Sequence, residues 1–226
     1  MDRQKVLVLT TCAYEKAARG WSSWDRIEEE MRRRYGFPRV LGRDAYQHVP
    51  ERVDRPFALP ARLMYQGHRS TYKRADPFIR EIERKHDVDI FFISGGYRIV
   101  GGRELIYYYE CELGDTGSYR MVRPESVAPF VLDRLERETQ RLDFNSVIVS
   151  LSADYFRTIY DGERALWRIL SDNLTKPHVF VIGPRDERRR AVEYCRDLGL
   201  KVKGLQKDRN FFNYESKATI RKHLNP

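Results

Sequence analysis

The chain has 226 residues, of which 41% are hydrophobic and 33% are charged, a balance typical of a folded globular protein and not of a disordered one. No apolar stretch approaches the roughly 20 residues that span a bilayer, and the first residues lead into a predicted strand without a signal-peptide pattern. We therefore expect a cytoplasmic protein with no membrane partner.

The formal net charge of the chain is +9. Such an excess of positive charge favours polyanionic partners, namely DNA, RNA or nucleotides. A second interpretation is that arginine and glutamate form surface ion-pair networks, as in proteins from hot environments. Runs that mix both signs along one predicted helix, such as 26–34 and 186–190, fit this second interpretation. The two interpretations do not exclude each other.

Three cysteines, Cys12, Cys111 and Cys195, are scattered along the chain. An odd number without C-x-x-C spacing argues against a disulfide framework and against a zinc ribbon. Cys12 lies at the end of a predicted strand and is a candidate catalytic residue, although isolated cysteines are more often small core residues. The five histidines are scattered as well, so we expect neither a metal site nor a cofactor.

The first predicted strand is the apolar run 5–10, which is typical of a central parallel strand. It ends in a polar loop where Thr11 and Lys16 are candidates for binding an anion. Neither a G-x-G-x-x-G fingerprint nor a P-loop is present. An amphipathic helix is predicted over 21–35, and the irregular segment that follows, up to residue 60, is long enough to be a binding loop or a lid.

A basic and aromatic segment follows Pro60. Arg62 and Tyr65 are candidates for binding a nucleotide or nucleic acid, since arginine neutralises phosphate and tyrosine stacks on bases. Asp76 and Pro77 then predict the start of a helix that runs to residue 86. The alternative is a helix that buries its aromatic residues and exposes its charges.

The most informative run is the apolar stretch 90–93 with the turn that follows it, Ser94-Gly95-Gly96-Tyr97-Arg98. A short apolar run bounded by glycines predicts a buried strand. We expect the two glycines to adopt positive φ and to let a ligand approach the backbone closely. Because ligand sites of α/β sheets lie at the carboxyl ends of strands, this turn is the predicted site, with Arg98 as an anion contact. The alternative is that the glycines form only a tight turn.

Two carboxylates follow this turn, Glu104 and Glu110. Carboxylates next to a strand end can act as general acid or base when burial raises their pKa, so both are candidate catalytic residues. They can also be ion-pair partners of Arg98 and Arg103.

The second half of the chain alternates predicted helices and strands. Helices are predicted over 124–142, 155–159, 162–173 and 185–198, with Asp154 as the cap of the second, and strands over 145–151, 178–184 and 200–205. Ser152 follows the strand 145–151 in another small polar loop and joins the candidate binding residues. Together the elements indicate an α/β fold with a largely parallel or mixed central sheet flanked by helices, of the Rossmann-like kind.

We predict one α/β domain over residues 1–205 and a basic C-terminal tail over 206–226. The tail combines lysine and arginine with aromatic residues, and its last part, 216–224, is predicted as a short basic helix. Lys217 and Arg221 on this helix are candidates for contacting nucleic acid.

Several of these segments are similar to motifs of the YaaA family of peroxide-stress proteins. The run Ile93-Ser94-Gly95-Gly96-Tyr97-Arg98 resembles the family's Leu-Ser-Gly/Ala-x-Tyr-Gly pattern, and 105–114 resembles its Leu-Ile-x-Pro-Tyr-x-Leu-Glu-Met-Gly pattern. Segment 147–156 is similar to the strand that leads into a Leu-Ala-Ser-x-Glu-Tyr-Phe pattern. Segments 61–65 and 12–16 resemble an Ala-Arg-x-Leu-Tyr element and a Cys-x-Lys-x-Lys loop of shorter relatives. The chain departs from the family at Arg98, which replaces a glycine, at Tyr107 or Tyr108, which stands for a proline, and at Tyr14, which replaces a lysine.

The resemblance extends over residues 5–160 in scattered motifs. It implies a single compact α/β fold, DNA binding and a part in protection against oxidative DNA damage. No established reaction comes with the family.

Three hypotheses about function follow. The first is a DNA- or RNA-binding protein of a damage or stress response. The second is an enzyme of the glycosidase or transferase kind that acts on a nucleotide, a nucleobase or a modified nucleic acid at the strand-end loops. This second hypothesis requires those loops to meet at one edge of the sheet. The third is a structural or partner-binding protein without a site of its own.

Overall fold

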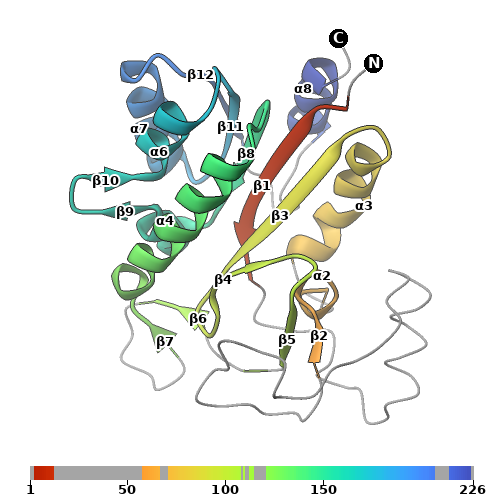
Figure 1. Ribbon diagram of the computed structural model, residues 1–226, viewed down its shortest axis with the longest axis vertical. Helices are drawn as coiled ribbons and strands as arrows, with labels where there is room; N and C mark the ends of the chain where they lie inside the picture. Colours follow the sequence, from red (N-terminus) through yellow and green to blue (C-terminus); the bar gives the residue numbers. More distant parts are fainter. Residues whose placement is uncertain are drawn as a thin grey trace.

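The computed structural model of the chain describes residues 3–12, 58–66, 71–107, 109, 112–114, 121–206 and 214–224 (Figure 1). The strands are β1 (Lys5–Thr11), β2 (Ala58–Pro60), β3 (Asp87–Ser94), β4 (Arg98–Gly101), β5 (Leu105–Tyr107), β6 (Glu112–Leu113), β7 (Met121–Val122), β8 (Ser146–Ser150), β9 (Tyr160–Asp161), β10 (Arg164–Ala165), β11 (His178–Gly183) and β12 (Lys201–Gln206). The helices are α2 (Ala61–Met64), α3 (Thr71–Glu83), α4 (Pro124–Arg141), α5 (Ala153–Phe156), the 3-10 helix η3 (Arg157–Ile159), α6 (Leu166–Asn173), α7 (Arg185–Asp197) and α8 (Tyr214–Leu224).

The central sheet has six strands in the order β12-β11-β8-β1-β3-β4. From β12 to β3 all neighbours are parallel, and the edge strand β4 runs antiparallel to β3. The inner strands are buried on both faces because they are continuous apolar runs, as in Val6 to Leu9, which are fully buried. The predicted α/β fold with a largely parallel, helix-flanked sheet is confirmed.

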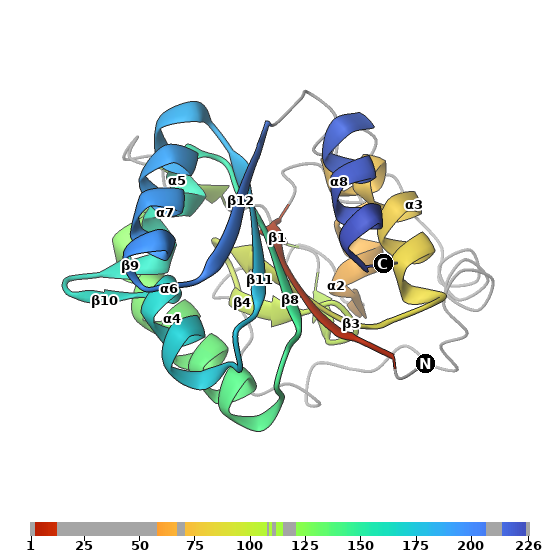
Figure 2. The same ribbon diagram turned by 90° about the horizontal axis from the view of Figure 1, so that it is seen from above.

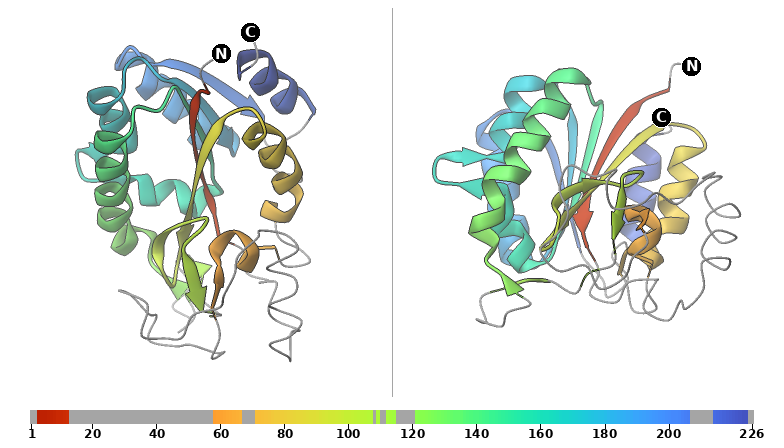
Figure 3. Two further views of the ribbon diagram at one scale, coloured as in Figure 1. Left: turned by 45° about the vertical axis from the view of Figure 1, so that its right-hand side comes forward. Right: turned by 60° about the horizontal axis from the view of Figure 1, so that its bottom comes forward.

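Helices cover both faces of this sheet (Figure 2). The helices α4, α5, α6 and α7 lie on one face, and α2, α3 and α8 lie on the other, which we call the α3 face. Ring contacts agree with this arrangement: Tyr72 of α3 packs edge-on against Phe92, with ring centroids 4.7 Å apart, and His223 of α8 lies 5.3 Å from Phe180. The strand pairs β2–β5 and β6–β7 lie at the end of the sheet where β1 and β3 finish (Figure 3).

Two elements differ from the sequence-based prediction. Helix α3 begins at Thr71, so that Pro77 lies inside it; Asp76 does not cap the helix because its carboxylate accepts hydrogen bonds from several neighbouring side chains instead. The first residues of the predicted helix 162–173 belong to the β9–β10 hairpin, since Gly162 with φ of +58° forms its turn, and α6 begins at Leu166. The predicted helix 21–35 and most of the segment up to residue 60 lie outside the described residues.

The C-terminal helix α8 packs against the same body. Ile220 and Leu224 are buried, and Ser216 donates a hydrogen bond to the carbonyl of Gln206 at 3.2 Å. Among the described residues, no helix is both long and apolar enough to cross a membrane.

Candidate functional site at the carboxyl edge of the sheet

The carboxyl ends of β1, β3 and β8 lie next to each other at one edge of the sheet. Strand β1 pairs with β3 on one side and with β8 on the other, both in parallel. After β1 the chain adds β3 and β4 on one side of it, and later adds β8, β11 and β12 on the other side. The order of the strands therefore reverses between β1 and β8, which makes this position a topological switch point. Ligands of open α/β sheets bind outside the carboxyl ends at such points. Thr11 and Ser94 are the last residues of β1 and β3, and Ser152 follows β8, so all three lie at this edge.

Three hydroxyl groups form a buried hydrogen-bonded chain here. The Tyr109 hydroxyl lies 2.5 Å from Ser94 Oγ and 2.6 Å from the Tyr65 hydroxyl. Ser94 Oγ also accepts a hydrogen bond from the backbone N–H of Tyr97 at 3.0 Å, and the Tyr97 hydroxyl accepts one from the N–H of Tyr107 at 2.7 Å. The side chains of the turn are therefore held in place by residues distant in sequence.

Cys12 and Tyr155 extend this arrangement across the switch point. Cys12 Sγ lies 2.9 Å from the Tyr155 hydroxyl, and the Cys12 N–H donates to the carbonyl of Ile93 at 2.8 Å. Burial, followed by the nearby Cys12 thiol, raises the pKa of Tyr65 and Tyr109 above the ordinary value for a phenol. We call the following residues the hydroxyl cluster: Cys12, Tyr65, Ser94, Tyr97, Tyr109 and Tyr155.

Two further hydroxyl groups lie side by side at this edge. Thr10 on β1 is the register partner of Ser150 on β8 and of Phe92 on β3, so all three side chains point to the α3 face. Thr10 and Ser150 are fully buried, and neither hydroxyl has a hydrogen-bond partner within the described part of the chain. A buried unpaired hydroxyl costs about 1–3 kcal/mol. These two groups therefore suit a ligand or an ordered water that pairs with them.

The glycine turn has a different backbone from the one expected. Positive φ occurs at Arg98, with φ of +64°, and not at Gly95 or Gly96. The close approach at Gly96 is made by Tyr109, because a Cβ there would lie 2.5 Å from that ring. The Arg98 guanidinium lies 3.5 Å from the ring centroid of Phe130 on α4. The glycines thus make room for a tyrosine of the cluster, and Arg98 stacks on α4.

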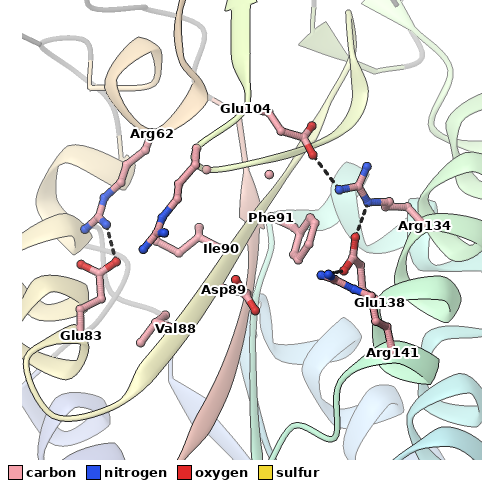
Figure 4. Close-up of a pocket in the computed structure, with 13 residues that line it drawn as sticks. Arg62, Glu83, Val88, Asp89, Ile90, Phe91, Glu104, Arg134, Glu138 and Arg141 are labelled. Carbon is pink, nitrogen blue, oxygen red and sulfur yellow. Dashed lines mark hydrogen bonds and ion pairs between the residues drawn. The ribbon is translucent and has the colours of Figure 1, made fainter. Parts of the chain in front are cut away.

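Arg62 and Glu104 lie around a cavity of about 170 Å³ beside the edge of the sheet (Figure 4). Arg62 forms ion pairs with Asp76, at 2.8 Å, and with Glu83. Burial lowers the pKa of Arg62, but Tyr72 and the two carboxylates outweigh this effect and raise it.

A second ion-pair network lines this cavity on the side of α4. Arg134 donates to Glu104 at 2.6 Å and to Glu138 at 2.8 Å. The charges that line the cavity balance, with Arg62, Arg103, Arg134 and Arg141 against Glu83, Asp89, Glu104 and Glu138. Arg62 and Glu104 thus form ion pairs with other residues of the protein.

The remaining predicted residues are distributed as follows. Arg221 of α8 donates to both carboxylate oxygens of Glu81 at 2.7 Å, and Lys217 Nζ lies 5.9 Å from the ring centroid of Phe78, so both face α3. Lys16 and Glu110 lie outside the described residues.

Four residues of this edge were not among the predicted ones: Thr10, Tyr109, Ser150 and Tyr155. A signal for three of them was available, because Tyr109, Ser150 and Tyr155 stand inside segments 105–114 and 147–156, which resemble family motifs. No motif marks Thr10, because it lies within the apolar run 5–10 that predicts a strand.

Comparison of the chain with protein-family models, with curated proteins and with solved structures finds no match. Within the described ranges, no group of three or more His, Cys, Asp or Glu side chains could hold a metal ion. Inference about function therefore depends on the geometry at the carboxyl edge.

Proposed function

We propose that the protein binds a nucleotide through its nucleobase at the carboxyl edge of the sheet, between β1 and β8 on the α3 face. The observation that carries this proposal is the convergence of five separate segments on one hydrogen-bonded cluster. These segments, all similar to YaaA motifs, contribute Cys12 from 12–16, Tyr65 from 61–65, Ser94 and Tyr97 from 93–98, Tyr109 from 105–114 and Tyr155 from 147–156.

The chemistry of this edge favours a flat, uncharged ligand group. Serine, threonine and tyrosine hydroxyls both donate and accept hydrogen bonds, which matches the mixed donors and acceptors on the edge of a base. Tyrosine rings supply faces on which bases stack. The six side chains of the hydroxyl cluster are uncharged in their protonated forms, so they suit the base better than a phosphate.

A catalytic form of this proposal is an enzyme of the glycosidase or transferase kind. It is favoured by Cys12, whose thiol lies 2.9 Å from the Tyr155 hydroxyl at the switch point, because cysteine is one of the side chains that serve as nucleophiles in covalent catalysis. Incubation with nucleotides and analysis of the products tests it: turnover by the wild type that is lost in Cys12→Ala, with binding retained, supports catalysis. Binding without any product contradicts it.

The binding proposal is tested with three single variants and isothermal titration calorimetry. Thr10→Val and Ser150→Ala remove the two unpaired hydroxyls at the carboxyl edge, and each should weaken nucleoside binding about tenfold through one lost hydrogen bond. Ser146→Ala is the matched control, since Ser146 is also buried and unpaired on the same face of β8 but at the opposite end of the strand. Equal affinity of all three variants for nucleosides would contradict the proposal.

A second candidate function is association with DNA or RNA, as the resemblance implies. The net charge of +9 favours it. Gel-shift series on duplex, bulged and single-stranded DNA at rising salt concentration test it, because affinity should fall steeply as counterions are released. Absence of any shift at low salt removes this candidate.

A further inference from the structure

A second cavity lies on the face of the sheet opposite to the one that carries Thr10 and Ser150, and its volume is about 490 Å³. It begins where β8 ends and lies between α5, η3 and β9 on one side and α7 on the other. The residues that line it are Ala153, Asp154, Phe156, Arg157, Tyr160, Glu187, Arg190 and Tyr194. Its size falls within the roughly 300–1,000 Å³ of small-molecule sites, and β8 and β11, whose ends it adjoins, are neighbours in the sheet.

Two aromatic walls of this cavity are held rigidly. Phe156 is buried against the end of β11, where a Cβ on Gly183 would lie 2.3 Å from its ring. The Tyr160 hydroxyl accepts a hydrogen bond from Trp167 Nε1 at 2.7 Å. A cavity whose walls are fixed before binding loses little entropy when a ligand enters, so this shape is suited to a planar guest.

The charged groups of the cavity differ in how they are engaged. Arg157 forms an ion pair with Glu125 of α4. Arg190, Asp154 and Glu187 have no ion pair or side-chain hydrogen bond within the part of the chain that the structure describes. Arg190 and Tyr160 line the same cavity. Burial raises the pKa of the Tyr160 phenol, and the charge of Arg190 opposes this rise. The cavity thus combines aromatic walls with the guanidinium of Arg190 and the carboxylates of Asp154 and Glu187.

We propose that this cavity is a second ligand site and takes a nucleoside 5′-monophosphate. The base stacks against Tyr160 and Tyr194, the ribose hydroxyls donate to Asp154 or Glu187 as they do to acidic residues in dinucleotide sites, and the phosphate pairs with Arg190. The choice of a nucleotide as the ligand class rests on the proposed function. The location and the roles of the residues rest on the cavity alone.

The test uses the full chain and the fluorescence of Trp167, which is bonded to Tyr160 at the cavity wall. Adenosine and adenosine 5′-monophosphate are titrated into the wild type, Arg190→Ala, Arg189→Ala and Trp167→Phe. We expect the monophosphate to change the fluorescence saturably in the wild type and Arg189→Ala, and the change to be lost in Trp167→Phe. Arg190→Ala should weaken monophosphate binding by about 10- to 100-fold, the value of one charged hydrogen bond, and adenosine binding little. Arg189 is the matched control because it neighbours Arg190 on α7 but does not line the cavity.

The outcomes separate this proposal from the proposed function. Two results would overturn the cavity site. One is equal affinity of Arg190→Ala and Arg189→Ala for the monophosphate, and the other is Trp167 fluorescence in the wild type that does not change when the monophosphate is added. Nucleoside binding that Thr10→Val weakens in that case leaves the proposed function standing. Conversely, monophosphate binding that depends on Arg190 supports the cavity site, and nucleoside binding measured by calorimetry that is unchanged in Thr10→Val and Ser150→Ala contradicts the site between β1 and β8.

Discussion

At the scale of single residues, the turn after β3 shows how side chains far apart in sequence determine a local backbone. Gly96 allows the Tyr109 ring to pack directly on the main chain, and that ring places the hydroxyl that joins Ser94 to Tyr65. Arg98 adopts a left-handed conformation that glycine favours. Its stacking on Phe130 partly offsets the conformational cost.

Gly96→Ala should disrupt the hydroxyl cluster. The added Cβ would lie 2.5 Å from Tyr109, a buried ring that its hydrogen bonds hold in place, so we expect a loss of about 1–3 kcal/mol in the free energy of unfolding. Gly101→Ala is the control, because the nearest atoms to its Cβ belong to the partly exposed Glu104 side chain, at 3.2 Å or more. Urea unfolding measures both variants, and an equal loss in the two would show that Tyr109 does not require Gly96.

Substitutions at Arg98 separate backbone strain from stacking. Both Arg98→Ala and Arg98→Gly lose the contact with Phe130, but only the alanine variant keeps a Cβ at φ of +64°. We therefore expect the glycine variant to be more stable than the alanine variant by about 1 kcal/mol, the reverse of the usual order. Thermal unfolding of the two proteins decides the point, and a more stable alanine variant would refute the left-handed assignment.

At the scale of elements, buried charge networks join the helices of the α3 face. The Asp76 carboxylate accepts hydrogen bonds from Arg62 of α2, from Gln66, and from Tyr72 and Arg80 of its own helix. Arg221 joins α8 to α3 through Glu81, at a more exposed position. The burial of the first network and the exposure of the second predict unequal contributions to stability.

Asp76→Asn should destabilise the protein strongly. It removes one of the two counter-charges of buried Arg62, and breaking a buried ion pair costs about 3–5 kcal/mol. Glu81→Gln breaks the half-exposed pair with Arg221 and should cost less than about 1 kcal/mol. Unfolding in guanidinium chloride compares the stability of the two variants. Similar midpoints would mean that the Asp76 network contributes little to the free energy of unfolding.

The contact of α8 with β11 predicts a dependence of stability on pH. The His178 and His223 rings contact each other with centroids 3.8 Å apart and planes tilted by 43°, and Lys201 and Lys203 of β12 lie nearby. Burial first, and then these neighbouring charges, lower the pKa of both histidines below the ordinary value of 6.5. Since the unfolded chain then binds protons more readily than the folded one, stability should fall as the pH drops below 6.5.

Hydrogen exchange of residues 214–224 at pH 7.5 and pH 5.5 measures this effect through protection factors, which correct each observed rate for the intrinsic exchange rate at that pH. Lower protection factors are expected at pH 5.5, and His223→Phe, which keeps a ring against Phe180 but cannot take up a proton, should reduce the difference. Protection factors in α8 that are equal at both pH values in the wild type would contradict the prediction.

At the scale of the whole molecule, the fold follows from local sequence patterns, whereas the site depends on contacts between side chains that are distant in sequence. The inner strands and α4 are continuous apolar or amphipathic runs, so the sequence predicts them with small errors at their ends. The partners of Arg62, Arg98 and Glu104 lie between 14 and 32 residues away, and no local pattern identifies them. Ser94, Cys12 and Tyr65 could be predicted because strand ends and motifs mark them, but their hydrogen-bond partners could not.

The net charge of +9 also has a partial structural account. Several arginines, among them Arg134, Arg164 and Arg221, form pairs or small networks with carboxylates on neighbouring helices and strands. Such networks fit the second interpretation of the composition, in which arginine and glutamate form surface ion pairs as in proteins from hot environments. The basic residues Lys217 and Arg221, considered for nucleic acid, face α3, which makes the carboxyl edge the stronger candidate for ligand binding.

The most direct test of the central claim is a crystal structure of the protein soaked with a nucleoside 5′-monophosphate. The account predicts a base held in front of the carboxyl ends of β1 and β8, with the Thr10 and Ser150 hydroxyls bonded to it and the cluster from Ser94 to Tyr109 beside it. A ligand confined to the cavity beside α7 would support the second site alone. No ligand at the β1–β8 edge at saturating concentration would contradict the central claim.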